Sequence, residues 1–248
     1  MNSNSNSYIF IYSIVMVVIV AAVLSIAATV LKPKQQQNIR NEKMSSILAS
    51  AGVESTAENA EELYKKYITR EVVINSNGEV VGTYENGKLN GEVRAFDVNI
   101  KTEQFNQKNG DDFVAPFFEC NYEGKKYYIV PILGKGLWGP IWGNIAFKDD
   151  FNTVVGVVFD HKGETPGLGA EIATPAFQNQ FPGKTIFDEN GNFVSVKVQK
   201  GGIVTLPDNM QNHAVDAISG GTITSLGTDA MMRNCLSNYV TYIKNLKK

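Results

Sequence analysis

The sequence has 248 residues, enough for one large domain or two small ones with an ample hydrophobic core. A formal net charge of −2 and an aromatic content of 10% give no sign of a nucleic-acid partner, and we expect none. The two cysteines, Cys120 and Cys235, lack C-x-x-C spacing and an accompanying histidine cluster, which argues against a zinc or iron–sulfur site. We therefore expect no bound metal. A disulfide between them stays open, although the apolar helical stretch around Cys235 favours a buried free thiol.

An apolar segment near the N-terminus predicts a membrane anchor. Residues Tyr8–Leu31 contain no charged side chain, and these 24 residues exceed the roughly 20 that a helix needs to cross a bilayer. A cleaved signal peptide would have a basic N-terminal region and a shorter apolar core, whereas residues 1–7 carry no basic side chain. We predict a tail at 1–7 and an uncleaved transmembrane helix at 8–31, in contact with the lipid bilayer.

The charge pattern around this anchor leaves its orientation open. Four basic residues follow the apolar segment: Lys32, Lys34, Arg40 and Lys43. The positive-inside rule would therefore place the C-terminal bulk of the chain in the cytoplasm. Long domains, however, translocate largely regardless of charge.

The next part of the chain, residues 32–69, reads as a helical linker region. Apolar positions predict one helix over residues 35–51, with Gly52 as its stop. Ser55 and Glu58 have the spacing of a capping box that would open a second helix.

Residues 70–248 read as one domain with helices and an antiparallel sheet, so the predicted class is α+β. Two alternating runs, at 70–75 and 79–84, predict a hairpin around Asn75-Ser-Asn-Gly78. Helical spacing of apolar residues between Met231 and Leu246 predicts a helix of several turns near the C-terminus. Further strands are expected at residues 96–100, 126–132, 144–147, 153–159 and 193–198.

The stretch Gly134-Lys-Gly-Leu-Trp-Gly-Pro-Ile-Trp-Gly143 predicts a loop in which Trp138 and Trp142 lie close to the backbone. One interpretation is that such a flat ring packs beside a planar ligand, where aromatic pairs gain about 0.5–1.5 kcal/mol beyond area burial. The other is that the tryptophans fill the core beneath a buried turn.

A second glycine-rich stretch, His161-Lys-Gly-Glu-Thr-Pro-Gly-Leu-Gly-Ala170, follows a predicted strand. Its glycines permit a ligand to approach the backbone, and Glu164 and Thr165 offer an acceptor and a donor to the polar edge of a ring system. The alternative is a solvated turn fixed by Pro166. His161 and Glu164 alone make a weak metal site.

A third stretch, Asp216-Ala-Ile-Ser-Gly-Gly-Thr-Ile-Thr-Ser225, immediately precedes the C-terminal helix. Two adjacent glycines and the open first turn of a helix form an anion site from backbone N–H groups. Thr222 places a hydroxyl where a phosphate would rest. A plain Ser/Thr-rich turn that caps the helix is the alternative. The candidate binding residues here are Ser219, Gly220, Gly221, Thr222 and Thr224.

Together and in this order, the three stretches and the N-terminal anchor resemble the C subunits of Na⁺-translocating NADH:quinone reductases. The last two stretches also resemble the G subunits of Rnf electron-transport complexes, which remain an alternative. The tryptophan-containing stretch favours the quinone reductase. The family usually has alanine where this chain has Gly221, and glycine keeps that position small.

The resemblance implies a membrane-anchored subunit with FMN joined to Thr222 by a phosphoester bond. It implies an isoalloxazine ring near Glu164, Thr165, Leu168 and Gly169, with Trp138 as a further neighbour. The FMN would relay electrons from NADH towards quinone, coupled to Na⁺ export. The implied partners are the other membrane subunits and a flavin transferase. The implied location is the bacterial inner membrane, with the soluble domain on the periplasmic side.

Two readings from other classes compete with this one. The first is a membrane-tethered flavin-binding or sensory domain without electron-transfer partners. The second is a hydrolase in which Ser219 or Thr222 is the nucleophile and His161 or His213 the base. The hydrolase reading lacks a G-x-S-x-G context and an acid that would orient either histidine.

Overall fold

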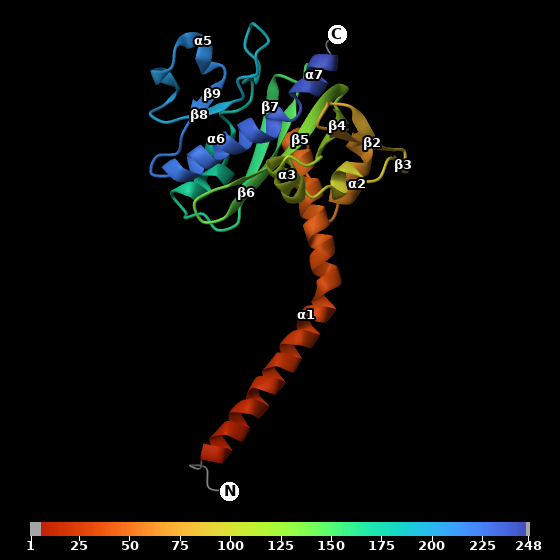
Figure 1. Ribbon diagram of the computed structural model, residues 1–248, viewed down its shortest axis with the longest axis vertical. Coiled ribbons are helices and arrows are strands. Elements are labelled where there is room, and N and C mark those ends of the chain that lie inside the picture. The colour runs from red at the N-terminus through yellow and green to blue at the C-terminus, as the bar shows by residue number, and fades with distance from the viewer. Residues whose placement is uncertain (1–5, 247–248) are drawn as a thin grey trace. The chain divides into compact units, whose positions relative to one another are not determined.

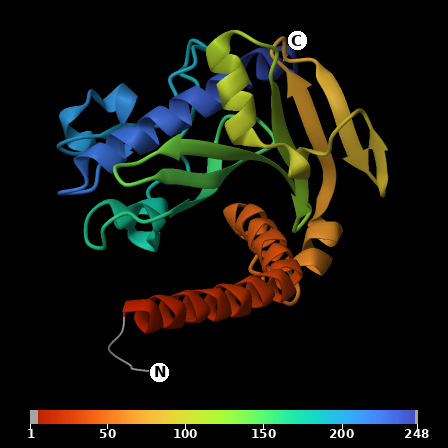
Figure 2. The same cartoon turned by 60° about the horizontal axis from the view of Figure 1, so that its bottom comes forward.

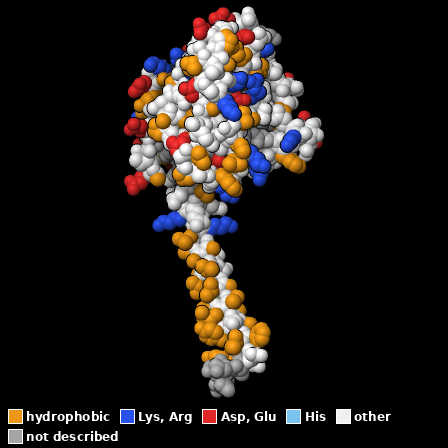
Figure 3. Space-filling model, turned by 90° about the vertical axis from the view of Figure 1, so that its left-hand side faces the viewer, with side chains coloured by type: hydrophobic (Ala, Val, Ile, Leu, Met, Phe, Trp, Pro, Cys, Tyr) orange, Lys and Arg blue, Asp and Glu red, His pale blue; other side chains and the backbone are white. Residues whose placement is uncertain are grey.

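The computed structural model describes residues 6–246, and the chain divides into two compact units, which meet between Lys43 and Met44. The described part of the first unit lies within α1 (Asn6–Ser50), shown in red to orange in Figure 1. Among the described residues α1 is the one helix long and apolar enough to cross a membrane, and its apolar window is not buried by protein. In Figure 3, hydrophobic side chains cover much of the face of α1 that is in view, a pattern typical of a membrane-spanning helix.

The anchor at 8–31 and the helix predicted at 35–51 form one continuous helix, because α1 runs through Pro33 without interruption. Proline removes a single N–H from the helical ladder, and the lysines and glutamines that follow are good helix formers. The C-terminal end of α1 belongs to the second unit, where Ile47 and Leu48 are fully buried. Its predicted stop is confirmed: Gly52 has φ 82°, and Val53 N donates to Leu48 O at 3.1 Å.

The predicted capping box before the next helix is wrong. The helix α2 (Ala60–Tyr67) begins after Asn59, whose Oδ1 accepts a hydrogen bond from Thr56 N at 2.7 Å. The hydroxyl of Ser55 is buried and has no hydrogen-bond partner among the described residues. The asparagine therefore orders this turn, while the Ser55–Glu58 pair does not.

A seven-stranded antiparallel sheet forms the centre of the second unit, in the order β3-β2-β1-β4-β5-β6-β7. The predicted hairpin at Asn75–Gly78 is confirmed as the β1–β2 connection. The stretch predicted as a tryptophan-containing loop is mostly strand, because the pairing of β5 with β6 extends as far as Lys135 opposite Pro140. The strands are β1 (Ile68–Asn75), β2 (Val80–Glu85), β3 (Lys88–Asn90), β4 (Val114–Tyr122), β5 (Lys125–Lys135), β6 (Pro140–Phe147) and β7 (Val154–His161).

Two predicted strands are wrong in whole or in part. Residues 96–100 form the 3₁₀ turn η1 (Ala95–Asp97) and the start of α3 (Ile100–Asn109), where Asn99 Oδ1 accepts from Lys101 N at 3.2 Å. Of residues 193–198, only the end enters a strand, β8 (Lys197–Gln199), which pairs in parallel with β9 (Ala214–Asp216). The other elements are η2 (Gly169–Ala173), α4 (Pro175–Gln178), η3 (Ile203–Thr205), α5 (Asp208–Gln211), α6 (Thr222–Ser237) and α7 (Val240–Leu246).

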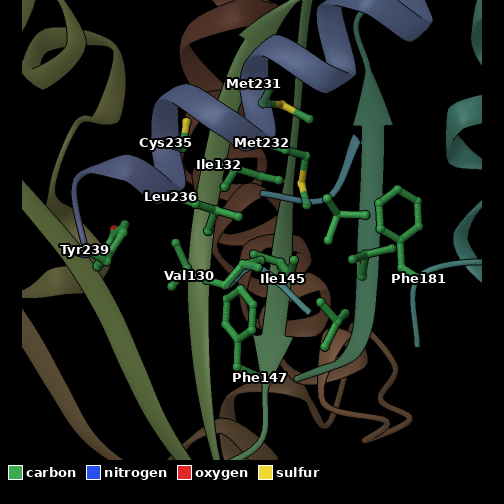
Figure 4. Packing of buried hydrophobic residues seen from close by; sticks show 14 of the residues in the cluster. Val130, Ile132, Ile145, Phe147, Phe181, Met231, Met232, Cys235, Leu236 and Tyr239 are labelled. Atoms are coloured by element: carbon green, nitrogen blue, oxygen red, sulfur yellow. The ribbon is translucent and has the colours of Figure 1, made fainter. Parts of the chain in front are cut away.

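Helix α6 packs across one face of the sheet, and this packing fixes the position of its N-terminal end (Figure 4). Its buried side chains Met231, Met232, Cys235 and Leu236 recur at helical spacing, as the sequence predicts, and they point towards β5 and β6. The residues beneath them include Val130, Ile132, Ile145 and Phe147. Each such side chain contributes about 1.5–3 kcal/mol when it is fully buried.

The two cysteines belong to hydrophobic clusters on opposite faces of the sheet, and both are free thiols. Cys235 lies under α6, whereas Cys120 lies in the cluster that the end of α1 and α2 cover. The disulfide that the sequence left open is therefore not formed.

Candidate functional site

The loop that precedes α6 is anchored at its start by Asp216, the last residue of β9. Asp216 Oδ1 accepts a hydrogen bond from Ile203 N at 2.7 Å, and Asp216 N donates to Gln180 Oε1 at 2.8 Å. The first residue of the predicted stretch is thus tied to two neighbouring segments through its side chain and its backbone. Residues 217–221 then lead directly into the first turn of α6.

The end of the same loop is closed by Ser225, one turn inside the helix. Its buried hydroxyl accepts from Ile218 N at 3.1 Å, and its N–H donates to Gly221 O at 2.9 Å. Between these contacts the backbone reverses at Gly220, whose φ of 74° is readily available only to glycine. Ser225 has a positioning role that sequence reasoning did not assign, although its place inside the hydroxyl-rich stretch was a signal.

The two glycines of the loop lie directly against the second predicted stretch. A Cβ on Gly220 would come within 2.6 Å of Leu168 Cδ2. A Cβ on Gly221 would come within 2.9 Å of Ile218 Cγ2 and 3.3 Å of the Leu168 carbonyl carbon. The alanine usual in the resembling family would therefore require Ile218 to shift in this chain. The structure brings the stretches at 161–170 and 216–225 into contact at Leu168.

Thr222 occupies the first position of α6, and its side chain is exposed. Gly221 is the N-cap and supplies no side-chain cap. Within residues 6–246, the N–H groups of Thr222, Ile223 and Thr224 have no recorded hydrogen-bond partner. Three free donors and the positive end of the helix dipole therefore lie in the same helical turn as Thr222, an arrangement that favours a bound phosphate by about 0.3–1 kcal/mol through the dipole alone.

Glu164 joins the three predicted stretches from inside the protein. Its buried carboxylate accepts Trp138 N at 2.8 Å through Oε1 and Thr224 Oγ1 at 2.6 Å through Oε2. Its own N–H donates to His161 Nδ1 at 3.2 Å. Both oxygens of Glu164 are therefore engaged by the protein, and the carboxylate fixes the hairpin tip and the first turn of α6 relative to each other.

Gly169 leaves the space in which this carboxylate meets Thr224. A Cβ at that position would lie 2.4 Å from both Glu164 Oε2 and Thr224 Oγ1. Any side chain larger than glycine would therefore separate the two oxygens. Thr224 itself is 2% exposed, so its hydroxyl faces the interior and not the surface beside Thr222.

The remaining predicted residues form an exposed, partly apolar surface around the loop. Thr165 is exposed, and Leu168 retains 42% of its accessible surface. Trp138 is 68% exposed and Trp142 is 37% exposed, so the interpretation of the tryptophans as core residues is wrong. The turn at residues 165–168 is solvated, and it also carries the Leu168 side chain onto the surface next to Gly220.

Two exposed apolar residues on α6, Ile223 at 55% and Leu226 at 58%, were missed by sequence reasoning. They follow Thr222 by one and four residues, on a helix whose large buried side chains begin at Met231. The sequence could have indicated their exposure, because both residues lie outside the stripe of helix positions that continues through Met231 and Cys235. Apolar side chains left exposed beside a hydroxyl and three free N–H groups suit an amphipathic ligand with an anionic end.

The hydrolase reading is not supported by the geometry. His213 Nδ1 lies 3.0 Å from Thr185 Oγ1, and His161 Nδ1 accepts the Glu164 N–H. In the described part of the chain neither histidine is hydrogen-bonded to Ser219 or Thr222. Among those same residues, no group of three or more His, Cys, Asp or Glu side chains is arranged to hold a metal ion.

Burial beneath α6 raises the pKa of two side chains, Cys235 and Tyr239. Desolvation raises the pKa of the Cys235 thiol, which exchanges hydrogen bonds with Leu133 N and Leu133 O at 3.4 Å. Burial also raises the pKa of Tyr239 well above its ordinary value, and its hydroxyl donates to Pro116 O at 2.6 Å. These two side chains beneath α6 therefore stay protonated near neutral pH.

The family of FMN-binding domains matches residues 136–237, a range that holds the predicted stretches from the β5–β6 turn onwards. The C subunit of the Na(+)-translocating NADH-quinone reductase from Vibrio vulnificus strain YJ016 is 33% identical over 211 residues, or 83% of this chain and 80% of the relative. The C subunit of the same name from Haemophilus ducreyi is 32% identical over 233 residues, covering 92% of this chain and 88% of its own length.

Solved structures agree with these sequence relatives. The crystal structure of the Na(+)-translocating NADH-quinone reductase C subunit from Parabacteroides distasonis is 40% identical and superposes with a TM-score of 0.72, over 86% of this chain and 96% of its own. The crystal structure of Shewanella oneidensis NqrC is 26% identical with a TM-score of 0.65, over 83% of this chain and 98% of its own. The predicted α+β class with an N-terminal apolar helix is thereby confirmed.

Proposed function

The chain belongs to the family of Na⁺-translocating NADH-quinone reductase C subunits, and on that premise we propose that it carries FMN joined covalently to Thr222 through a phosphoester bond. It is a subunit of an oxidoreductase complex with an FMN-binding domain. When bound, FMN would supply the redox chemistry that passes electrons from NADH towards quinone, coupled in the complex to Na⁺ export.

The proposal rests on the environment of Thr222. Its hydroxyl is exposed at the first turn of a 16-residue helix, beside three N–H groups without recorded partners in residues 6–246. A phosphoester at Oγ1 would place its remaining negative charge against those donors and the helix dipole. The neighbouring Ser219 is also a hydroxyl residue, but it precedes the turn at Gly220 and lies outside α6, which begins at Thr222.

The neighbouring residues fit an amphipathic group attached there. Leu168 lies against Gly220 and exposes its side chain, Gly169 keeps the backbone of that loop close to α6, and Thr165 offers an exposed hydroxyl. Trp138 presents a largely exposed ring from the β5–β6 turn. We assign Leu168, Thr165 and Trp138 to contact with the flavin ring. Glu164 would position these segments from beneath through its bonds to Trp138 N and Thr224.

Attachment by a flavin transferase requires that Thr222 can reach the active site of another protein. The hydroxyl of Thr222 and the turn at Ser219–Gly220 are exposed, while Asp216 and Ser225 hold the two ends of the loop. The transferase would therefore meet a short, pre-ordered loop in which Thr222 is exposed at the first position of the helix. Gly221, where alanine is usual, adds no obstacle to that approach.

Replacement of the attachment oxygen tests the proposal. Thr222→Val keeps the β-branched shape and removes only the hydroxyl, so covalent FMN should be lost while the thermal unfolding temperature of the apo-protein stays the same. Ser219→Ala, three residues earlier, is the matched control and should retain the flavin. Both variants are co-expressed with the flavin transferase and read by ultraviolet fluorescence of the denatured band and by peptide mass spectrometry. A mass increase of an FMN phosphoester on any other residue, or its persistence in Thr222→Val, would disprove the assignment.

For the membrane, we propose that α1 crosses the inner membrane once through residues 8–31, with the domain that follows on the periplasmic side. The uninterrupted apolar surface of α1 supports the crossing, and the size of the domain makes the positive-inside pattern of Lys32 and Lys34 a weak guide. Protease added to intact spheroplasts should digest the large domain. Protection until the membrane is broken would reverse the proposed topology.

A further inference from the structure

A large groove lies between α3 and α6, above the ends of β5 and β6. Its volume is about 890 Å³, comparable with the roughly 300–1,000 Å³ of pockets that hold small ligands or anchoring side chains. Figures 1 and 2 show α3 and α6 on the same side of the sheet. Its floor is apolar and comes from residues such as Leu133, Gly134 and Met231.

The rim of the groove carries unpaired positive charge. Lys101 and Lys108 line it from α3, and Lys135 lines it from the end of β5. All three side chains are exposed, and within residues 6–246 none of their ammonium groups has a recorded hydrogen bond or ion pair. The residues that line the groove include no aspartate or glutamate, although the whole chain has a net charge of −2. This is a local basic surface on a mildly acidic protein.

The walls of the groove are held by contacts that leave little freedom. Gln104 Nε2 donates to Leu133 O at 2.7 Å, which ties α3 to β5. A Cβ on Gly227 of α6 would come within 2.3 Å of Lys135 O, so the helix and the strand are in close contact there. A surface that is ordered before binding loses little conformational entropy when a partner docks.

One end of the groove reaches the proposed flavin site. Gly227 lines the groove and follows Thr222 by five residues, which corresponds to about 7.5 Å along a helix axis. Near that end the chain exposes Leu137 and Trp138 on the β5–β6 turn and Ile223 on α6. A partner seated in the groove would therefore also meet apolar side chains beside the attachment position.

We propose that this groove is the docking site for an acidic segment of a neighbouring subunit of the same complex, a proposal that rests on the function proposed above. The segment would place carboxylates at Lys101, Lys108 and Lys135 and an apolar side chain on the floor. A protein segment fits better than a membrane surface, because the three lysines line the rim of a concave groove, whereas a membrane surface requires a flat or convex face. Docking here would bring the partner close to the proposed flavin site.

Charge reversal in the assembled complex tests this inference. The variant is Lys101→Glu/Lys108→Glu/Lys135→Glu, and the complex is purified at 0.3 M NaCl through a tag on this chain. The amount of the other subunits that is retained should fall by about tenfold or more, and quinone reduction should fall with it. The matched control reverses three exposed lysines elsewhere, Lys88, Lys148 and Lys200, and should leave both readouts unchanged. Ultraviolet fluorescence of the denatured band reports FMN attachment separately, so a loss of quinone reduction through missing flavin is distinguished from a loss through missing subunits.

Photo-crosslinking gives a second measurement that does not depend on the stability of the triple variant. A benzoylphenylalanine at Lys108 in the purified complex should form a crosslink to one acidic segment of another subunit, whereas the same group at Lys148 should not. Equal subunit retention in both triple variants, with FMN intact, would overturn the proposal. So would crosslinks from position 108 to lipid alone or to no subunit, the first of which would assign the groove to an anionic membrane surface.

Discussion

Substitution of Gly169 by alanine should disconnect Glu164 from α6. The new Cβ would lie 2.4 Å from both Glu164 Oε2 and Thr224 Oγ1, two atoms that are now joined by a 2.6 Å hydrogen bond. The methyl group must push these oxygens apart by several tenths of an ångström or more. Forcing an extra methyl into a packed site costs about 1–3 kcal/mol, and loss of a hydrogen bond to a charged acceptor costs about 1.5–3 kcal/mol.

These two costs overlap, because the methyl group breaks the bond by occupying its space. We therefore expect a loss of about 3 kcal/mol in the free energy of unfolding, which for a chain of this size corresponds to about 6–12 °C in the unfolding temperature. The measurement is thermal unfolding of the full chain in detergent, followed by tryptophan fluorescence. Gly163→Ala is the matched control, because no atom lies within 4 Å of its added Cβ.

A double-mutant cycle separates this mechanism from general crowding. Thr224→Val removes the hydrogen-bond donor and leaves Gly169 unchanged. Because both substitutions break the same bond, the double variant should lose less unfolding free energy than the two single variants together, by about 1 kcal/mol or more. Strict additivity would refute the reasoning. An unfolding temperature of Gly169→Ala within about 2 °C of Gly163→Ala would refute it as well.

Two further predictions concern the ends of the loop and the buried thiols. Ser225→Ala leaves Ile218 N without its acceptor, so it should lower the free energy of unfolding by about 1 kcal/mol and slow FMN attachment without moving it from Thr222, as peptide mass spectrometry would show. Burial raises the pKa of Cys120 to about 12 and also raises that of Cys235, so at pH 8 both thiols stay protonated and iodoacetamide should modify neither until denaturant is added. Rapid labelling of either thiol in the folded chain would contradict its buried place.

Much of the local architecture could be predicted from the sequence, because it depends on neighbours in the chain. The apolar run at 8–31, the turn at Asn75–Gly78, the stop at Gly52 and the helical stripe around Met231 each follow from short-range patterns, and the structure confirms the helix, the turn, the stop and the stripe. The likeness of three short stretches to one family was equally local. It led to the right family because these residues surround one site.

The failures come from places where local patterns were ambiguous. Residues 96–100 alternate like a strand, yet Asn99 caps a helix there. Strand β4, with Phe117 and Phe118 both fully buried, was not predicted, since a strand that is covered on both faces shows no alternation. The anchor at 8–31 and the helix at 35–51 were predicted separately, but one missing hydrogen bond at Pro33 does not end a helix whose neighbours favour it.

Part of the site could be predicted from the sequence, and part of it depends on the tertiary structure. Its residue types could be read from the sequence: Thr222 at a helix start after two glycines, and Glu164 with Gly169 in a turn. Only the tertiary structure decided that the Glu164 carboxylate faces inwards to Thr224 and Trp138 N, that Leu168 lies against Gly220, and that Trp138 is exposed. The physical reason is that each of these facts depends on the approach of segments separated by about 25 to 60 residues, which packing of α6 on the sheet determines.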